Sequence, residues 1–287
     1  MRSTVHEQDA VTGWDVARPS RPGRMSGVSM AGFRDRGTGP VDLRAVPHPA
    51  VTLVVEFGEG WLVVDDATGR QQRGSVVAGL TLGELRTRGE NIECVEVHLS
   101  PVVARTVLGV GPVELDRAVI ALDDLWGRDA SLLREQLRDA PSWESRFALT
   151  DALLARRCET GPCVAPEVAR AWDRIVVSRG RVRIDDLALQ VGWSRKRLWS
   201  RFRSQIGCSP KRAAKLVRFN HAAHHLATGT SAARVAAEGG YADQSHLHRE
   251  VRAFTGVTPA ILAGDPGLAV DGTAWAGQGP FVQDRRP

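Results

Sequence analysis

The sequence has few cysteines, few lysines and no long apolar run. Four cysteines, Cys94, Cys158, Cys163 and Cys208, are too few and too scattered for the disulfide framework of a small secreted domain. An apolar run such as Val51–Phe57 has the length of a strand and is far shorter than the ~20 residues of a membrane helix. The amino-terminal residues lack the apolar stretch of a signal peptide. We therefore expect a reduced, cytoplasmic protein with no place in a membrane.

Charge is distributed unevenly along the 287 residues, whose net charge is +5. Residues 1–164 carry a net charge of −4, residues 165–264 carry +10, and residues 265–287 carry −1. All three lysines lie in the basic segment. A basic domain beside a mildly acidic one favours a polyanionic partner for the basic domain only, and nucleic acid is the leading candidate. A solubilising basic face is the alternative.

The apolar spacing changes from that of strands to that of helices near Pro101. Before it, short Val- and Leu-rich runs between Gly and Asp turns predict strands in the ranges Met25–Phe33, Ala50–Gly58, Gly60–Asp66, Gly74–Leu82 and Glu93–Ser100. After it, leucines at helical spacing predict helices. The fold class is therefore α+β. Residues 1–24 are expected to be poorly ordered, 25–158 to form a β-then-α domain, 159–166 a linker, 167–264 an all-α domain and 265–287 a flexible tail.

The all-α segment contains an internal repeat. Ala188, Gly192 and Trp193 match Ala236, Gly240 and Tyr241 at an offset of 48 residues. Further matches follow at an offset of 49, namely Leu198 with Leu247, Phe202 with Val251, Gly207 with Gly256, and Ser209-Pro210 with Thr258-Pro259. A small Ala lets two helices approach closely, and Gly suits the tight turn between them. The repeat therefore predicts two helix-turn-helix units.

The second helix of the first unit is strongly cationic. Leu198 and Phe202, four residues apart, are spaced to anchor it. The stretch Ser194–Arg203 holds no acid and five cations, Arg195, Lys196, Arg197, Arg201 and Arg203. Such a helix fits the major groove of DNA, where Arg and Lys reach guanine edges or phosphates. Because a merely solubilising face usually mixes both signs of charge, we favour DNA binding.

A single helix is predicted between the two units. It begins after a Ser209 cap with Pro210 in its first position and ends at Gly229. About 19 residues span roughly 28 Å, close to the ~34 Å between successive major-groove faces on one side of a duplex. One chain can therefore present two recognition helices to adjacent grooves.

Residues ~166–264 resemble the DNA-binding domain of the AraC/XylS family of bacterial transcriptional regulators. The resemblance is carried by IDDLALQVGWSRKRLWSRFRSQIGCSPKRAAKLVR and VAAEGGYADQSHLHREVRAFTGVTPAIL, about a third of the chain. It implies two helix-turn-helix units that read two major-groove segments. By position it implies a DNA-binding set of Arg195, Lys196, Arg197, Trp199, Ser200, Arg203, Gln244, Ser245, His248 and Arg249.

Four positions depart from the family pattern. Val251 stands where Phe is usual, and Leu262-Ala263 stands where a Tyr-Arg pair is usual. Trp199 is unusual at a reading position, and two roles are open to it. It either contacts a thymine methyl group or tucks back against its own domain.

The N-terminal domain fits the family layout, in which a variable and often cupin-like domain precedes the DNA-binding one. The resemblance implies a domain that senses a small molecule, dimerises the protein, or does both. We expect an apolar pocket built by the strands that carry Val51–Phe57 and Trp61–Val64. A filled core that only dimerises the protein is the alternative. The expected partners are double-stranded DNA, RNA polymerase, a small-molecule effector and a second copy of the chain.

No enzyme signature is found, and no catalytic residue, metal ligand or cofactor is assigned. A cupin metal site needs clustered His and Glu, and the strand region offers His48 and His98 alone among histidines. His221, His224 and His225 have a spacing that zinc can use, but packing or solvent exposure is the simpler role. Cys158 and Cys163 have no second matching pair. The alternative function is a cupin-like small-molecule-modifying enzyme with an attached DNA-binding domain.

Overall fold

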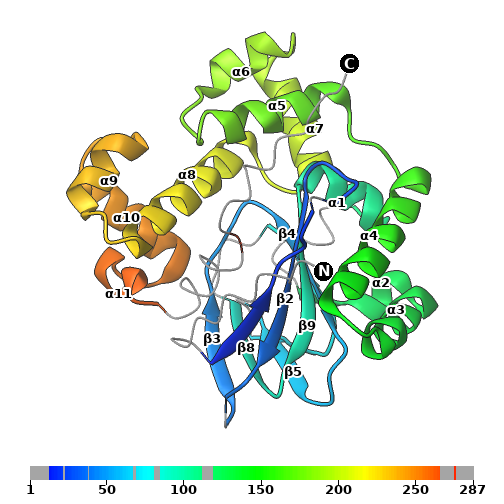
Figure 1. Cartoon of the computed structure of the whole chain (residues 1–287). Helices are drawn as coiled ribbons and strands as arrows, with labels where there is room; N and C mark the ends of the chain where they lie inside the picture. Colours follow the sequence, from blue (N-terminus) through cyan, green and yellow to red (C-terminus); the bar gives the residue numbers. More distant parts are fainter. Residues whose placement is uncertain are drawn as a thin grey trace.

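The computed structural model describes residues 13–21, 23–37, 39–66, 69–80, 85–111, 119–265 and 275. Two antiparallel β-sheets form the N-terminal part, and helices form the rest (Figure 1). This is the expected α+β order. No helix within these residues is long and apolar enough to cross a membrane.

Six strands form the larger sheet. Their order is β1 (Trp14–Ala17), β2 (Val28–Asp35), β9 (Glu93–Leu99), β4 (Val51–Glu56), β7 (Val76–Ala78) and β10 (Val119–Ala121). The smaller sheet has the order β3 (Val41–Ala45), β8 (Leu85–Glu90), β5 (Trp61–Asp65) and β6 (Gln71–Arg73). Every assigned pair is antiparallel. The two sheets together build the β-unit that the sequence predicts.

Strand β9 is buried on both faces. Val95, Val97 and Leu99 belong to one core, which the helices complete, whereas Cys94 belongs to a second core between the two sheets. This arrangement follows from the two-residue period of a strand, which sends alternate side chains to opposite faces. The larger sheet is therefore a partition between a helix-covered core and an inter-sheet space.

Four helices follow the strands and cover the outer face of the larger sheet (Figure 1). They are α1 (Pro101–Leu108), α2 (Leu122–Trp126), α3 (Arg128–Asp139) and α4 (Trp143–Thr160). Their apolar residues are buried, including Leu133, Leu137, Phe147 and Leu154. Ser142 caps α4 by accepting a hydrogen bond from the Ser145 amide, as its position before the helix predicts.

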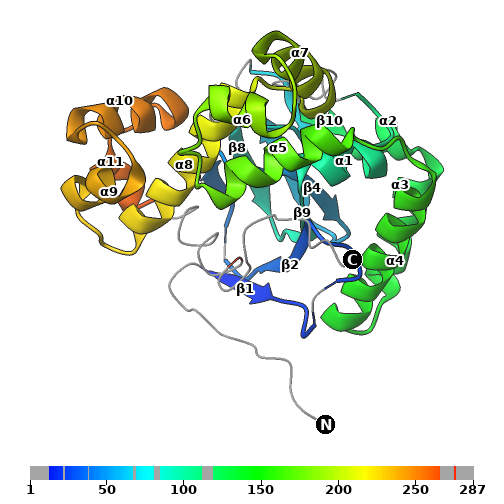
Figure 2. The same ribbon diagram turned by 90° about the horizontal axis from the view of Figure 1, so that it is seen from above.

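The C-terminal part is all helical. It contains α5 (Pro166–Val177), α6 (Ile184–Gln190), α7 (Arg195–Ile206), α8 (Pro210–Ala227), α9 (Ala232–Gly239), α10 (Gln244–Thr255) and α11 (Pro259–Ala263). Figure 2 shows α6–α7 and α9–α10 on either side of α8. The predicted linker is shorter in the structure, because α4 continues to Thr160 and α5 begins at Pro166.

The structure corrects the prediction that residues 1–24 are poorly ordered. Trp14–Ala17 form β1, which pairs with β2, and both Val16 and Ala17 are buried. The sequence pattern also does not predict β3, β6, β8 and β10, because these strands are short or rich in charged residues. Residues 1–12 and most of the predicted tail 265–287 lie outside the described residues, as does the end of the strand predicted over 74–82.

Gly192→Ala should destabilise the first helix-turn-helix unit by backbone strain alone. The φ of Gly192 is +71°, and a Cβ atom there would meet no other atom within 4 Å. A left-handed conformation costs an L-residue about 1–2 kcal/mol. We expect urea denaturation to show a loss of this size. Gly39→Ala is the matched control, because that site is equally open and lacks a positive φ. Equal stability of the two variants would contradict the explanation.

Candidate DNA-binding surface and inter-sheet cavity

The two helix-turn-helix units close their turns in the same way. In the first unit the Trp193 amide donates to the Ala188 carbonyl at 3.0 Å, and in the second the Tyr241 amide donates to the Ala236 carbonyl at 3.2 Å. Gly192 and Gly240 adopt φ values of +71° and +75°. Both alanines are buried. The repeat in the sequence is therefore a repeat in hydrogen bonding and backbone geometry.

Equivalent caps begin and end the two second helices. Ser194 accepts from the Arg197 amide at the start of α7, and Asp243 accepts from the His246 amide at the start of α10. Gly207 and Gly256 then end these helices in the left-handed conformation. A glycine supplies this conformation at no steric cost.

Helix α7 buries a narrow stripe and exposes the rest. Leu198, Phe202 and Ile206 are buried against the domain core. All six α7 residues of the predicted DNA-binding set are exposed, namely Arg195, Lys196, Arg197, Trp199, Ser200 and Arg203. The same holds for Gln244, Ser245, His248 and Arg249 on α10. Every residue of the predicted set is therefore available to a partner.

Three of the exposed side chains on α7 have neighbours within the domain. Arg195 forms an ion pair with Asp185 of α6 at 2.9 Å. The guanidinium of Arg197 lies 4.7 Å from the centre of the Trp193 ring, and that of Arg203 lies 5.3 Å from the centre of the Trp199 ring. Trp199 itself is 49% exposed. It is therefore not tucked into its domain core, and its ring stays accessible beside a cation.

Sequence reasoning left Arg201 out of the DNA-binding set. It lines a shallow surface depression together with Ser194, Lys196, Arg197 and Ser200. The signal was present, because Arg201 belongs to the run of five cations in Ser194–Arg203. The depression gathers positive charge and hydroxyl groups at the first half of α7, where a phosphate or a base edge can be held.

A buried ion pair supports the second unit. Arg218 of α8 donates through Nε to a Glu250 carboxylate oxygen of α10 at 3.0 Å, and a second, shorter contact makes the pair bidentate. The Arg218 guanidinium also lies 4.6 Å from the centre of the Tyr241 ring. Val251 and Leu262, two departures from the family pattern, are both fully buried. Their smaller or different side chains therefore sit in a closed core.

Helix α8 joins the two units as a single element. Ser209 caps it by accepting from the Arg212 amide, and Pro210 occupies its first turn, as the sequence predicts. Its 18 residues span about 27 Å at 1.5 Å per residue. Nine of them are buried against α5, α9, α10 and α11, so that α8 is a structural axis as well as a connector.

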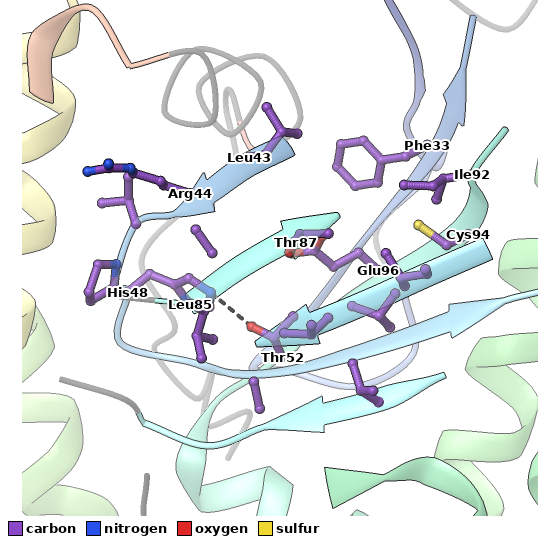
Figure 3. A pocket seen from close by; sticks show the side chains of 18 of the residues that line it. Phe33, Leu43, Arg44, His48, Thr52, Leu85, Thr87, Ile92, Cys94 and Glu96 are labelled. Atoms are coloured by element: carbon purple, nitrogen blue, oxygen red, sulfur yellow. Dashed lines mark hydrogen bonds between the residues drawn. The ribbon is translucent and has the colours of Figure 1, made fainter. Parts of the chain in front are cut away.

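A cavity of about 150 Å³ lies between the two sheets (Figure 3). The strands that contain Val51–Phe57 and Trp61–Val64 contribute Thr52, Val54, Leu62 and Val64 to its wall, as predicted. The rest of the wall is mostly apolar and comes from both sheets. The β-unit is therefore not a completely filled core.

Polar groups gather at one part of this cavity. Glu96 lies between an apolar end, which includes Phe33 and Ile92, and an opposite end at His48 (Figure 3). The His48 ring nitrogen Nε2 lies 2.9 Å from the Thr52 hydroxyl. The other ring nitrogen, Nδ1, is buried and has no hydrogen-bond partner among the described residues.

Glu96 and His98 form a pair on one face of β9, in which His98 is buried and Glu96 lines the cavity. Glu96 Oε1 and His98 Nε2 are 2.7 Å apart. Burial raises the pKa of Glu96 to about 7 and lowers the pKa of His98 to about 3. Between about pH 3 and pH 7 both groups are therefore uncharged, and the protonated carboxyl donates to the neutral ring. The sequence marked His98 only as a weak metal candidate and did not mark Glu96.

Aromatic stacking links the cavity to the C-terminal region. The His98 ring stacks on His48 at a centroid distance of 4.1 Å and on Trp275 at 3.7 Å. The pKa of His48 is lowered well below its ordinary value by burial, then by His98, then by His224 of α8. Helix α8 therefore lies within electrostatic reach of the cavity.

One hydrogen bond from the N-terminal part and one from the linker reach the first helix-turn-helix unit. Arg105 of α1 donates to the Ser204 carbonyl at 3.2 Å, and the Ala165 amide donates to Gln205 Oε1 at 2.7 Å. Both acceptors lie in the last turns of α7. The predicted DNA-binding residues of the first turns stay clear of this contact.

Metal-binding candidates from the sequence do not assemble in the described part of the chain. No group of three His, Cys, Asp or Glu side chains there is arranged to hold a metal ion. His221 and His225 lie against each other on α8, with ring centroids 4.5 Å apart. Cys158 and Cys163 are both free thiols.

Comparison with known proteins finds a family match in the C-terminal part. Residues 187–263 match the model of a family described as a helix-turn-helix domain. No curated protein matches significantly. The chain is similar to ToxT from Vibrio cholerae O395, with 12% identity, a TM-score of 0.46, and 83% of this chain and 97% of that chain covered. It is also similar to the C-terminal domain of AraT, a response regulator from Geobacillus stearothermophilus, with 20% identity, a TM-score of 0.34, and 35% and 85% covered. The AraC-like transcriptional activator CuxR has 13% identity, a TM-score of 0.31, and 70% and 84% covered.

Glu96→Gln should stabilise the protein more at about pH 8 than at about pH 5. Because burial raises the Glu96 pKa from 4.5 to about 7, the native state retains a proton that the unfolded chain releases. Native stability therefore falls as the pH rises from about 4.5 to about 7, and the variant avoids this loss. We expect a difference of about 1–3 kcal/mol between the two pH values.

Urea unfolding of both proteins at the two pH values measures this effect. The lowered pKa values of His48 and His98 reduce stability in acid in both proteins, so they largely cancel in the comparison. Glu59→Gln, at an exposed site, is the control. A stability change that is the same at both pH values would show that Glu96 does not titrate in this range.

Proposed function

We propose that the protein is a sequence-specific transcriptional regulator of the AraC type, whose helix-turn-helix domain over residues 187–263 reads two successive major-groove segments. One observation carries the proposal. Two units with the same turn geometry each present an exposed second helix, and α8 connects them. The net charge of +10 over residues 165–264 supplies attraction to the phosphate backbone.

The first unit reads bases through the early turns of α7. Lys196 and Ser200 lie one turn apart on the exposed face, with Trp199 beside them. Lys196 suits a guanine edge, and the exposed Trp199 ring suits a thymine methyl group. Arg197 and Arg203 are assigned to phosphates. Arg195 is also assigned to a phosphate, which requires its ion pair with Asp185 to break. Breaking this pair costs little free energy, because exposed ion pairs contribute about 0–1 kcal/mol.

The second unit reads bases through α10. Gln244 and Ser245 occupy its first turn, and His248 and Arg249 follow one turn later. Gln suits an adenine edge, and Arg suits guanine through two parallel hydrogen bonds. The Nε2 atoms of Gln244 and His248 lie 3.5 Å apart, so these two side chains can be oriented together.

The N-terminal domain is proposed to bind a small-molecule effector in the inter-sheet cavity. Two routes lead from that cavity to the DNA-binding domain. One runs from His48 to His224 on α8, and the other from α1 to the last turns of α7. A cytoplasmic location, contact with RNA polymerase and self-association are part of the proposal. The alternative of a cupin-like enzyme with an attached DNA-binding domain has no specific observation in its favour.

The salt dependence of DNA affinity tests whether the protein binds DNA at all. Fluorescence anisotropy with fragments selected from genomic DNA should show an affinity that falls steeply as salt rises, because bound cations displace counterions from DNA. We expect a log–log slope of several units, since the surface offers more than five cations. Absence of DNA binding, or an affinity that salt leaves unchanged, would contradict the proposed function.

Lys196→Ala and Arg249→Ala should weaken recognition of different half-sites. Each variant removes a proposed base contact, so it should cost about 1–3 kcal/mol and relax the base preference in one segment only. Footprinting should show the two lost segments about one helical turn apart. Lys211→Ala, on α8 outside the recognition helices, is the control. Loss of the same segment in both variants would exclude the two-groove arrangement.

A further inference from the structure

Within the described residues, the inter-sheet cavity has an acid and no opposing cation. Two of the residues in its wall carry a formal charge, Glu96 and Arg44. In the β3–β8 register Arg44 is opposite Arg86, whose guanidinium pairs with Asp42 on the exposed face of the smaller sheet. Leu43 and Thr87, one residue along, form the neighbouring cross-strand pair and line the cavity. The two-residue period therefore directs Arg44 away from Glu96.

Glu96 retains binding capacity that the protein does not use. One of its oxygens contacts His98, and within the described ranges the carboxyl has no Arg or Lys partner. Its side chain is 22% exposed, and it lines the cavity, so a bound molecule can cover this surface. Burying a carboxylate without a cationic partner costs free energy. In this cavity the cost appears as a Glu96 pKa raised by burial to about 7. A cationic ligand would supply the missing partner.

Two further acceptors line the cavity on the side of Glu96 away from Phe33 and Ile92. Nδ1 of His48 is buried and unpartnered among the described residues, and the Thr52 hydroxyl contacts the other ring nitrogen. When His48 Nε2 donates to Thr52, Nδ1 keeps a free lone pair. An ammonium group has three donors and needs acceptors of this kind. The opposite end of the cavity, with Phe33 and Ile92, is apolar.

We propose that the inter-sheet cavity binds a small apolar amine, a single ring or short branched chain that carries one ammonium group, with Glu96 as its counter-ion. The size follows from the volume of about 150 Å³, similar to a cavity that accommodates benzene. The assignment rests on the proposed sensor role and adds the chemical class of the effector.

Competing ligand classes fit this wall less well. A carboxylate ligand would face Glu96, and two carboxyl groups that share a site force one of them to stay protonated. A sugar would need hydrogen-bond partners along its whole length, whereas most of the wall is apolar. A neutral ring fills the apolar end but gains no charge-assisted hydrogen bond, which is about twice as strong as a neutral one.

Three probes of one size and different charge test the proposal. Benzylamine, benzyl alcohol and benzoate are titrated into the full-length protein at about pH 7.5, with thermal shift and calorimetry as readouts. Benzylamine should raise the melting temperature with concentration, because a ligand that binds only the native state stabilises it. Benzyl alcohol should bind more weakly, and benzoate should give no shift.

Glu96→Gln separates the acid from the shape of the cavity. The variant should lose about tenfold or more in benzylamine affinity, a loss typical of one charge-assisted contact, while its benzyl alcohol affinity changes little. This retained alcohol binding shows that the variant is folded and its cavity intact. Exposed Glu59→Gln should leave all three affinities unchanged. Benzoate binding as tight as benzylamine, unchanged benzylamine affinity in Glu96→Gln, or no binding by any probe would overturn the proposal.

DNA binding is measured on the same samples, so that the two proposals fail separately. The amine titration needs no DNA and stands even if DNA binding is absent. If benzylamine binds through Glu96 and leaves DNA affinity unchanged, the amine site is supported and the sensor role is not.

Discussion

A narrow apolar anchor is the constraint on which the DNA-binding domain depends. Helix α7 has five cations in ten residues and no acid among them, and like charges at helical spacing oppose one another. Leu198, Phe202 and Ile206 offset this repulsion by burial against the domain core. Because tertiary packing supplies most of the stability of a short helix, three side chains suffice to hold it while the other faces remain exposed. The repulsion is then relieved by a polyanion.

The second unit anchors its recognition helix with an ion pair as well as with apolar side chains. Its anchor, Leu247, Val251 and Phe254, is supplemented by the Arg218–Glu250 pair and by stacking of Phe254 on Phe219. Removing one partner of such a pair would leave a buried charge uncompensated. The orientation of α10 relative to α8 is therefore fixed by charge as well as by packing, whereas α7 carries its positive charge almost entirely outward.

Local rules account for what the sequence predicts well. The helix-turn-helix units follow from Ala, Gly and cap residues within a few positions of each other, and their geometry agrees with the repeat. The inter-sheet cavity is different, because its wall comes from strands distant in the sequence. In β9 the alternation of Cys94, Glu96 and His98 with apolar residues is typical of a strand with one solvated face. The second sheet covers that face, and nothing local to β9 indicates it. Likewise β3 gains its order from β8, far along the chain.

The cavity and the DNA-binding surface meet at α8. This helix is buried along nine of its residues, carries Arg218 for the second unit, and brings His224 within electrostatic reach of His48. A long helix packed on several elements moves as one body, because close-packed interiors resist local deformation. A charge that appears at Glu96 changes the hydrogen bonding of His98 and therefore the environment of the stacked His48 ring. Since α8 also packs against α7 and α10, we propose that effector binding acts on DNA recognition by shifting α8, which moves both recognition helices relative to the N-terminal domain.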